Sequence, residues 1–293
     1  MIHINYSIII PHKNTPDLLN RCINSIPRRN DIQIIIIDDN SDSQIVDFNN
    51  FPGKNDKCIE VYFTKEGKGA GYARNIGLKH AKGKWLLFAD ADDYYSPKLI
   101  DTLDKHLTED IDILYFNVFS NDNDQYNRAT AINTIYDSYF QIRDANIIKY
   151  NVWAPWNKIF SHNYIKTNNL YFDEIPVGND AMFSLRASIN TNRLKVINDK
   201  LYCITYQANS ITYRPMTFER KLAHAKINLR INEFFRANKL FKYQITVCSP
   251  KTFFLLIKEN GYKQTFEYLK TIHQEDNLLH VLYIWIKKKL YSH

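Results

Sequence analysis

The first 120 residues alternate short apolar runs with longer stretches in which apolar residues recur every three or four positions. The short runs predict strands at 6–11, 32–38, 58–63, 85–89 and 111–119, and the longer stretches predict helices near 15–26, 70–81 and 97–107. The isoleucine-rich runs lack polar alternation, as is typical of strands buried on both faces. The pattern therefore predicts an α/β fold with a mostly parallel, Rossmann-like central sheet flanked by helices.

Beyond residue 120 the pattern is looser and more polar. The stretch 172–189 predicts a loop followed by a helix that begins near Asn179 or Asp180, because both residues are good N-caps. We expect a pair of strands around 195–206 and helices from 217 onward, with Lys and Arg on their polar side. The chain is therefore expected to consist of a main domain at 1–215 and a basic helical extension at 216–293.

Charge is distributed unevenly between these two parts. Residues 1–215 hold 24 Lys and Arg against 25 Asp and Glu, whereas residues 216–293 hold 14 against 6. An evenly basic protein would suggest a nucleic-acid partner, but a near-neutral body with a basic tail suggests contact with an anionic surface. We therefore expect no nucleic-acid partner.

Composition places the chain among ordinary globular proteins. It has 293 residues, of which 45% are hydrophobic, and can bury a substantial core. It has no apolar run of 18 residues and no signal-peptide pattern at its start, so we expect a cytoplasmic protein. The cysteines, Cys22, Cys58, Cys203 and Cys248, form no CxxC pair and are expected to be buried free thiols.

Polar residues follow three of the predicted strands, at 11–14 (PHKN), 38–41 (DDNS) and 90–93 (DADD). In open α/β sheets, ligands bind beyond the carboxyl ends of the strands. These three strand ends are therefore expected to converge on one binding site.

The acidic strand end at 90–93 has the composition of a metal site. Asp90 and Asp92 are separated by the small Ala91, so an irregular strand exit can aim both carboxylates into one cavity. Mg²⁺ and Mn²⁺ favour oxygen ligands, and Mg²⁺ commonly combines one or two carboxylates with substrate phosphates. The alternative is that these aspartates cap the helix that begins near residues 96–97. That role suits Asp93 best. Asp90 and Asp92 are explained less well by capping, because uncompensated charge at a buried strand end is costly unless a cation binds there.

Three other motifs each allow two interpretations. Asp38 and Asp39 begin a typical turn, but a carboxylate there can also accept hydrogen bonds from a base or a ribose. The glycine-rich stretch 65–83 is not a P-loop, and either provides loop flexibility or brings Arg74 to a diphosphate. Asp180 is expected to cap its helix, and a carboxylate there can also act as a general base toward an incoming hydroxyl.

Taken in order, these motifs resemble those of family 2 glycosyltransferases, which have the GT-A fold. The resemblance rests on YSIIIPHKN, IIIIDDNSDS, GAGYARNIGLKHAKGKWLLFADADDYYSP and FDEIPVGNDAMFSLRA, and covers about 5–120 and 150–215. It implies a nucleotide-sugar half at about 1–120 and an acceptor half at about 121–215. It also implies a nucleotide-diphosphate sugar donor such as a UDP-sugar, a Mn²⁺ or Mg²⁺ cofactor, inversion at the anomeric carbon, and a role in bacterial surface polysaccharide synthesis.

The resemblance implies a role for each candidate residue. Asp92 would bind the metal, and Asp180 would take the proton of the acceptor hydroxyl. The nucleotide would be contacted by the strand-end residues and by the arginine of the glycine-rich stretch, namely Pro11, His12, Asn14, Asp38, Asp39, Arg74, Asp90 and Ala91.

The sequence departs from the family pattern at two positions. Asn179 stands where many relatives have glutamate, which puts the tuning of Asp180 or an acceptor contact in doubt. His12 stands where tyrosine or phenylalanine is common, and either stacks on the base or belongs to the core. WNK at 156–158 also resembles the family, and Trp156 is either an aromatic platform on the acceptor side or a core residue.

The segment 278–291 contains an apolar, aromatic run that is followed by three lysines at 287–289. One interpretation places it in a membrane interface, with Tyr283 and Trp285 at headgroup depth and residues 287–289 toward anionic lipid. The other is a terminal helix packed on the domain. Since relatives often act on lipid-linked acceptors, the acceptor is expected to be a saccharide or a lipid-linked saccharide. Peripheral contact with the inner face of the cell membrane would then occur through this helix.

Three other functions fit the sequence less well. A phosphatase or phosphotransferase of the haloacid dehalogenase kind also has DxD after a strand, but there the motif follows the first strand and a threonine or valine replaces Tyr94. An inactive sugar-nucleotide-binding module would be expected to lack the metal aspartate or the base, and both are present. A dinucleotide-dependent oxidoreductase would need GxGxxG after the first strand, where PHKNTP stands instead.

Overall fold

The computed structural model describes residues 3–121, 129–206, 216–276 and 278–290. The chain divides into two compact units, Met1–Ser210 and Ile211–His293. The boundary that the sequence suggests between residues 215 and 216 adjoins 207–215, which lies outside the described residues.

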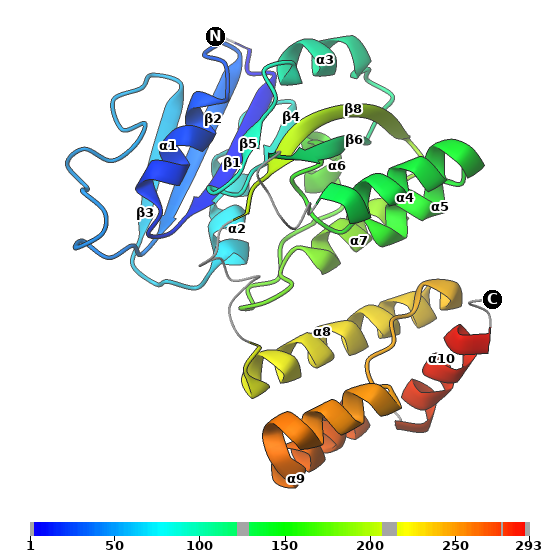
Figure 1. Ribbon diagram of the computed structural model, residues 1–293. Helices are drawn as coiled ribbons and strands as arrows, with labels where there is room; N and C mark the ends of the chain where they lie inside the picture. The colour runs from blue at the N-terminus through cyan, green and yellow to red at the C-terminus, as the bar shows by residue number, and fades with distance from the viewer. Residues whose placement is uncertain (1–2, 122–128, 207–215, 277, 291–293) are drawn as a thin grey trace. The chain divides into compact units, whose positions relative to one another are not determined.

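The first unit is built on an eight-stranded sheet (Figure 1). Its strand order is β3-β2-β1-β4-β7-β6-β8-β5. The strands are β1 (Tyr6–His12), β2 (Ile32–Asp39), β3 (Ile59–Thr64), β4 (Trp85–Phe88), β5 (Tyr94–Tyr95), β6 (Ile113–Ser120), β7 (Lys158–Ser161) and β8 (Leu194–Ile204). The four strands from β3 to β4 are mutually parallel, while β7 runs antiparallel to both β4 and β6. The parallel character is therefore concentrated in the half predicted to hold the nucleotide.

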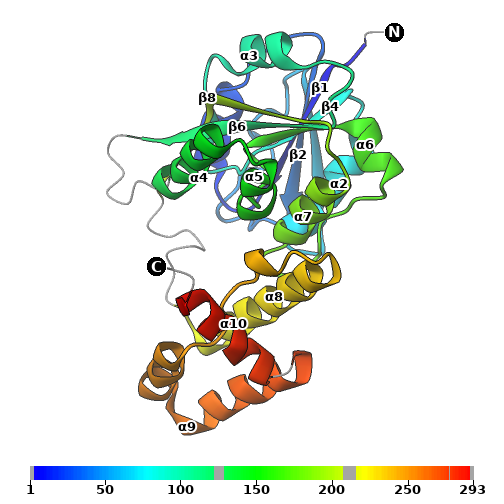
Figure 2. The same cartoon turned by 90° about the vertical axis from the view of Figure 1, so that its right-hand side faces the viewer.

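Helices cover both faces of this sheet, and Figures 1 and 2 show α1 and α2 on opposite sides of β1, β2 and β3. Side chains of α1 and α3 pack on one face, and those of α2, α4, α5, α6 and α7 pack on the other. The helices are α1 (Pro16–Asn24), α2 (Ala70–His80), α3 (Leu99–His106), α4 (Ala129–Ile142), α5 (Ala145–Asn151), α6 (His162–Thr167) and α7 (Ala181–Ile189).

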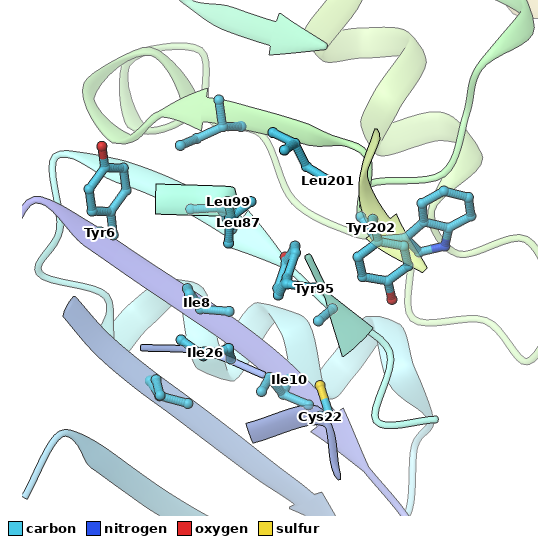
Figure 3. Close-up of a cluster of buried hydrophobic side chains, with 14 of the residues drawn as sticks. Tyr6, Ile8, Ile10, Cys22, Ile26, Leu87, Tyr95, Leu99, Leu201 and Tyr202 are labelled. Carbon is cyan, nitrogen blue, oxygen red and sulfur yellow. The ribbon is translucent and has the colours of Figure 1, made fainter. Parts of the chain in front are cut away.

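The uninterrupted apolar strands supply both cores, because successive side chains of a strand point to opposite faces. Ile8 and Ile10 of β1 face the α1 layer, while Ile9 faces the α2 layer. Figure 3 shows part of the first cluster, in which Ile8, Ile10, Cys22 and Ile26 pack together and Ile10 lies beside Cys22. All four cysteines are free thiols, and Cys58 alone among them is partly exposed.

One expected element is wrong. The sequence pattern predicts a pair of strands around 195–206, but Asn198, Asp199 and Lys200 do not form a turn between two strands. They are instead exposed residues within the single strand β8, which pairs with β6 on both sides of an irregularity. The exposed polar residues are accommodated by a shift in register rather than by a reversal of the chain.

The sheet order brings the predicted strand ends together. β1 lies between β2 and β4, and all three run parallel, so their carboxyl ends meet at one edge. The three polar segments singled out above lie at this edge: 11–14 and 38–41 begin with the last two residues of β1 and β2, and 90–93 begins two residues after β4.

The second unit is helical. It consists of α8 (Phe218–Ala237), a short 3-10 helix η2 (Phe241–Tyr243), α9 (Pro250–Glu275) and α10 (Leu278–Leu290), with a core that includes Leu229, Tyr268 and Ile272. Helix α9 is interrupted at Gly261, where φ is 76°. Across the described ranges, no helix combines the length and the apolar character needed to cross a bilayer.

Candidate active site

The carboxyl end of β2 is an acidic turn whose first carboxylate is fully hydrogen bonded. Asp38 accepts bonds from Nδ1 of His12 at 2.7 Å, the backbone N–H of Ser41 at 2.9 Å and the Ser41 hydroxyl at 2.6 Å. The Nε2 atom of His12 accepts the backbone N–H of Thr15 at 3.1 Å, so the ring proton is on Nδ1. Burial by itself would raise the pKa of Asp38, but the bonds from His12 and Ser41 outweigh it and hold that pKa below its ordinary value.

His12 is a core residue. Its side chain is 0% exposed, both ring nitrogens are engaged, and its ring meets Phe51 edge-on at 5.3 Å. Of the two interpretations considered for this residue, the structure matches the core histidine. A fully buried ring has no exposed face on which a nucleotide base could stack.

Asp39, the second carboxylate of this turn, connects β2 to the glycine-rich stretch. It accepts the backbone N–H of Gly69 at 2.7 Å, and the ammonium of Lys13 lies 4.0 Å away. Gly69 precedes α2 with a φ of 93°, a conformation that favours glycine. Asp39 therefore fixes the point at which α2 begins.

The end of β1 packs against the same turn. Asn14 adopts a φ of 56°, donates its backbone N–H to the Ser41 hydroxyl at 2.8 Å, and accepts the backbone N–H of Asp42 at 2.7 Å. Pro11 is buried within β1 opposite Ile37. The PHKN and DDNS segments thus form one hydrogen-bonded structure.

Arg74, on α2, joins three segments that are far apart in the sequence. Its guanidinium donates to Asp90 at 2.6 Å and to the side-chain oxygen of Asn179 at 2.7 Å, and it lies 5.4 Å from the ring centre of Phe172. The residue is only 4% exposed. The arginine thus ties the end of β4 to the loop that precedes α7.

A glycine permits this arrangement. A Cβ atom added at Gly71 would lie 2.1 Å from the backbone oxygen of Asp173, so α2 approaches the 173–179 loop more closely than any side chain would allow. The loop that carries Asn179 therefore rests directly on the helix that carries Arg74.

The carboxylates of Asp90, Asp92 and Asp93 form a cluster in which one oxygen from each lies within 4.8 Å of the others. Asp93 is 3% exposed and accepts the backbone N–H of Thr205 at 2.7 Å. Burial raises the pKa of Asp93 well above its ordinary value, and the charges of Asp92 and Asp90 raise it further. Three hard oxygen donors this close together, one of them buried where negative charge is disfavoured, fit a divalent cation.

The turn that holds this cluster is supported by residues that the sequence patterns do not reveal. The Tyr202 hydroxyl accepts the backbone N–H of Asp90 at 2.9 Å. Arg21 of α1 donates to the backbone oxygen of Asp92 and, at 3.1 Å, to the Thr205 hydroxyl. Ala91 is buried within the turn. No motif marks Arg21, Tyr202 or Thr205, since only the strand order brings α1 and the end of β8 to the end of β4.

Asp180 occupies the N-cap position of α7, yet its side chain makes no capping hydrogen bond. The expectation that it caps the helix is therefore wrong for the side chain. Burial raises the pKa of Asp180, Asp90 raises it further, and Arg74 and Lys158 oppose the rise. A carboxylate with a raised pKa that feels the charge of Asp90 and follows the Arg74-bound Asn179 in sequence is suited to proton transfer.

Trp156 belongs to the core rather than to an exposed platform. It is 8% exposed, and its ring stacks on Tyr202 with 5.0 Å between centroids and 7° between planes. The face that a sugar would need is occupied by another aromatic ring. Of the two interpretations offered above, the structure therefore matches the core residue.

The fold and the site together define a glycosyltransferase. The sequence model of glycosyl transferase family 2 matches residues 7–190, which is more than half of the chain. The chain belongs to this family, and its first unit has the GT-A fold expected from the sequence. The phosphatase and the inactive binding module are thereby set aside.

Curated relatives carry the same class of name. The chain is 28% identical over 236 residues to the glycosyltransferase EpsJ of Bacillus subtilis (strain 168), covering 75% of this chain and 68% of EpsJ. It is 24% identical over 209 residues to the poly(ribitol-phosphate) beta-N-acetylglucosaminyltransferase TarS of Staphylococcus aureus (strain MW2), covering 68% of this chain but only 35% of TarS.

Solved structures share the fold. S. aureus TarS 1–349 in complex with UDP-GlcNAc superposes with a TM-score of 0.65 at 21% identity, covering 93% of this chain and 81% of that one. The mannosyltransferase PcManGT from Pyrobaculum calidifontis, in complex with GDP-Man and Mn²⁺, gives a TM-score of 0.54 at 13% identity and covers 99% of this chain and 81% of that one.

Proposed function

We propose that the protein transfers a sugar, with inversion, from a nucleotide-diphosphate sugar to a hydroxyl of a saccharide acceptor in bacterial surface-glycan synthesis. The observation that carries this proposal is the position of Arg74, whose guanidinium contacts both Asp90 of the acidic cluster and the neighbour of Asp180. The UDP-GlcNAc bound to TarS supports a UDP-sugar as the donor.

The nucleotide would lie over the ends of β1 and β2. Asp39 and Asn14 would contact the base or ribose, Asp90 the ribose, and Arg74 the diphosphate. The surface would be supported from below by Asp38, His12, Pro11 and Ala91. The polar side-chain atoms of Asp38 and His12 are bonded within the protein, and Pro11 and Ala91 have no polar side-chain atoms.

A divalent cation, Mn²⁺ or Mg²⁺, would be held by Asp92 beside Asp90, and would supply positive charge to the departing diphosphate. The Mn²⁺ in the complex of PcManGT supports this choice. The buried Asp93 would add a further carboxylate beside the cation.

Asp180 would act as the general base. Its carboxylate would take the proton of the acceptor hydroxyl while that oxygen forms a bond to the anomeric carbon and the bond from this carbon to the diphosphate oxygen breaks. A single displacement inverts the configuration and releases a nucleoside diphosphate. Burial keeps the pKa of this carboxyl above its ordinary value, which strengthens it as a proton acceptor once ionised. Asn179 would orient Arg74, and Trp156 would belong to the packing behind the site.

The donor can be identified with a panel of UDP- and GDP-sugars in the presence of Mn²⁺. We expect one donor to raise the melting temperature of the wild-type protein, and we expect Asp92→Ala to abolish this rise. If no donor stabilises the wild type, or if the same donor stabilises Asp92→Ala equally, the proposed donor site is wrong.

The base is tested by Asp180→Asn, which keeps the shape of the side chain. We expect the variant to bind the donor with unchanged affinity and to lose transfer by about 10²- to 10⁴-fold, the range associated with general bases. Equal losses of donor binding and transfer would show that Asp180 contacts the donor instead.

We also propose that the second unit contacts an anionic membrane surface, where a lipid-linked acceptor would be available. Helix α10 buries Val281 and Ile284 but leaves Leu279, Tyr283 and Ile286 at 74%, 54% and 48% exposure. The helix therefore packs within its unit and still presents an apolar face. Helix α9 adds exposed Phe254, Leu255, Tyr262 and Phe266. Exposed apolar and aromatic side chains beside basic ones suit the interface of an anionic bilayer.

This proposal predicts that replacing Lys287, Lys288 and Lys289 by glutamine weakens co-sedimentation with anionic vesicles by about ten- to a hundredfold, since each lysine near the surface contributes about 1 kcal/mol. The matched control replaces the exposed Lys57, Lys98 and Lys105 of the first unit, which changes the net charge equally. Equal weakening by the two triple variants would indicate a general charge effect and overturn the proposal.

A further inference from the structure

One face of α2 holds the 173–179 loop at three points. Gly71, Arg74 and Asn75 are spaced by three and four positions, so they share this face of the helix. Gly71 lies against the backbone of the loop, and Arg74 bonds to Asn179 near its end. The third residue, Asn75, has no part in the proposed function.

The side chain of Asn75 bonds to the start of the loop through both ends of its amide. Its Oδ1 atom accepts the backbone N–H of Phe172 at 2.9 Å, and its Nδ2 atom donates to the backbone oxygen of the same residue at 3.0 Å. Nδ2 also donates to Oε1 of Glu174 at 3.0 Å. A carboxylate of the same shape could accept but not donate, and an aliphatic side chain could do neither. Asn75 is buried, so these bonds are shielded from water.

Phe172 connects this contact to the helix whose N-cap is Asp180. Its ring stacks on that of Phe183 of α7, with 3.9 Å between centroids and 13° between planes. Beyond Phe172 the chain enters a loop that is closed by a bond from the N–H of Asp173 to the backbone oxygen of Asn179 at 3.2 Å. A displacement of Phe172 would therefore move the loop and the start of α7 together.

Arg74 and Asn75 differ in what else they serve. Arg74 is shared between Asp90 and Asn179, and in the proposed function it also meets the diphosphate. The three side-chain bonds of Asn75 all go to residues 172–174, so a bound donor does not compete for them. Asn75 can therefore keep the loop on α2 while Arg74 engages the donor.

We propose that Asn75 is a positioning residue that holds the backbone before Asp180 where its carboxylate can reach the acceptor hydroxyl. The proposal rests on the assignment of Asp180 as the general base. Loss of the Asn75 amide would leave the two buried backbone groups of Phe172 unpaired, and the loop would shift relative to α2. A misplacement of about 1 Å can cost about a hundredfold in rate, so a small shift is enough to matter.

The test compares Asn75→Leu with Asn232→Leu, since leucine is similar in size to asparagine but forms no hydrogen bonds through its side chain. Asn232 of α8 is a matched control because its amide makes the same pair of bonds to the backbone of a distant residue, Ile245, at 2.6 and 2.8 Å. Asn232 is also buried, and it belongs to the second unit. We expect both substitutions to lower the melting temperature, but only Asn75→Leu to lower kcat.

Turnover is measured as release of nucleoside diphosphate from the donor that the panel selects. We expect Asn75→Leu to lower kcat about a hundredfold, while the dissociation constant of the same nucleoside diphosphate with Mn²⁺ changes by less than about twofold. Asn75→Ala leaves room for water to bond to Phe172, so it should show the same split with a smaller loss, and it decides the question if Asn75→Leu does not fold. Equal losses of kcat in Asn75→Leu and Asn232→Leu, or a matching loss of nucleotide affinity, would overturn the positioning role.

A measurement without turnover separates this proposal from the proposed function. Backbone N–H groups of residues 172–180 should exchange with deuterium faster in Asn75→Leu and Asn75→Ala than in the wild type or Asn232→Leu, while exchange in β1 and β2 stays unchanged. Unchanged exchange in 172–180 would overturn the role of Asn75. Faster exchange in a protein whose wild type turns over no donor would instead overturn the proposed function alone.

Discussion

The two acidic strand ends of the sheet handle their negative charge in opposite ways. At the end of β2, Asp38 receives hydrogen bonds from His12 and from two groups of Ser41, and its pKa is held below the ordinary value even though burial acts against it. At the end of β4, the carboxylates of Asp90, Asp92 and Asp93 gather within 4.8 Å, and the buried Asp93 has a pKa raised well above the ordinary value.

The difference indicates what each end is built to receive. A carboxylate whose charge is already compensated by donors of the protein is part of the scaffold, and it can present neighbouring groups to an uncharged base or sugar. A cluster in which two carboxylates raise the pKa of a buried third has an excess of negative charge, which a bound cation would compensate. Three predictions test this contrast.

The largest effect is expected for Asp38→Ala. This change leaves a buried His12 and Ser41 without their acceptor, so the free energy of unfolding should fall by about 3 kcal/mol in urea titrations. Asp42→Ala, an exposed aspartate in the same turn, should change it by less than about 0.5 kcal/mol. In EDTA, Asp92→Ala should leave stability unchanged or raise it, because it removes a charge that acts against Asp93. If Asp92→Ala lowered the free energy of unfolding as much as Asp38→Ala does, the proposed difference between the two strand ends would be wrong.

A second effect concerns Mn²⁺. At a concentration one hundred times its dissociation constant, a ligand that binds only the folded state adds about 2.7 kcal/mol to the free energy of unfolding. We expect Mn²⁺ to stabilise the wild-type protein in this way and to have no effect on Asp92→Ala. Stabilisation of both proteins would place the ion elsewhere.

The smallest effect concerns pH in metal-free protein. The pKa of Asp93 in the folded state lies above the ordinary value of 3.8, so between these two values the folded state binds more protons than the unfolded state. Stability should therefore fall as pH rises through this window, by up to about 1.4 kcal/mol per pH unit. Asp38 acts in the opposite sense, because its lowered pKa contributes stability above 3.8 that is lost as pH falls through its folded value.

This prediction is checked with Asp93→Asn, which can still accept the N–H of Thr205. Urea titrations in EDTA between pH 4 and 8 should show a decline for the wild type and a flatter curve for the variant. Parallel curves would mean that ionisation of the buried Asp93 does not lower the free energy of unfolding.

Most strands and helices of the first 120 residues could be predicted closely, because burial on both faces of a sheet leaves a continuous apolar signal. The strand predicted at 32–38 is observed as Ile32–Asp39, and the helix predicted at 70–81 as Ala70–His80. The acidic ends were also visible, since polar residues after a buried strand must face an edge of the sheet.

Residues whose role depends on strand order could not be predicted. Arg21 and Thr205 meet at the backbone of Asp92 because α1 and the end of β8 lie beside the end of β4, and nothing local to either residue indicates this. His12 and Trp156 were ambiguous for the same reason. An aromatic or imidazole ring near a strand end can face a ligand or the core. Here both rings face the core, because His12 hydrogen bonds to Asp38 and Trp156 stacks on Tyr202.

The side chain of Gly71 is a single hydrogen atom, and this lets α2 lie directly against the 173–179 loop. A methyl group there would overlap the oxygen of Asp173, so any larger residue would wedge α2 away from the loop that leads to Asp180. Arg74 moves with the helix and Asn179 with the loop, so their 2.7 Å bond would open first. The smallest side chain thus sets how closely the helix that carries Arg74 can approach the loop that leads to Asp180.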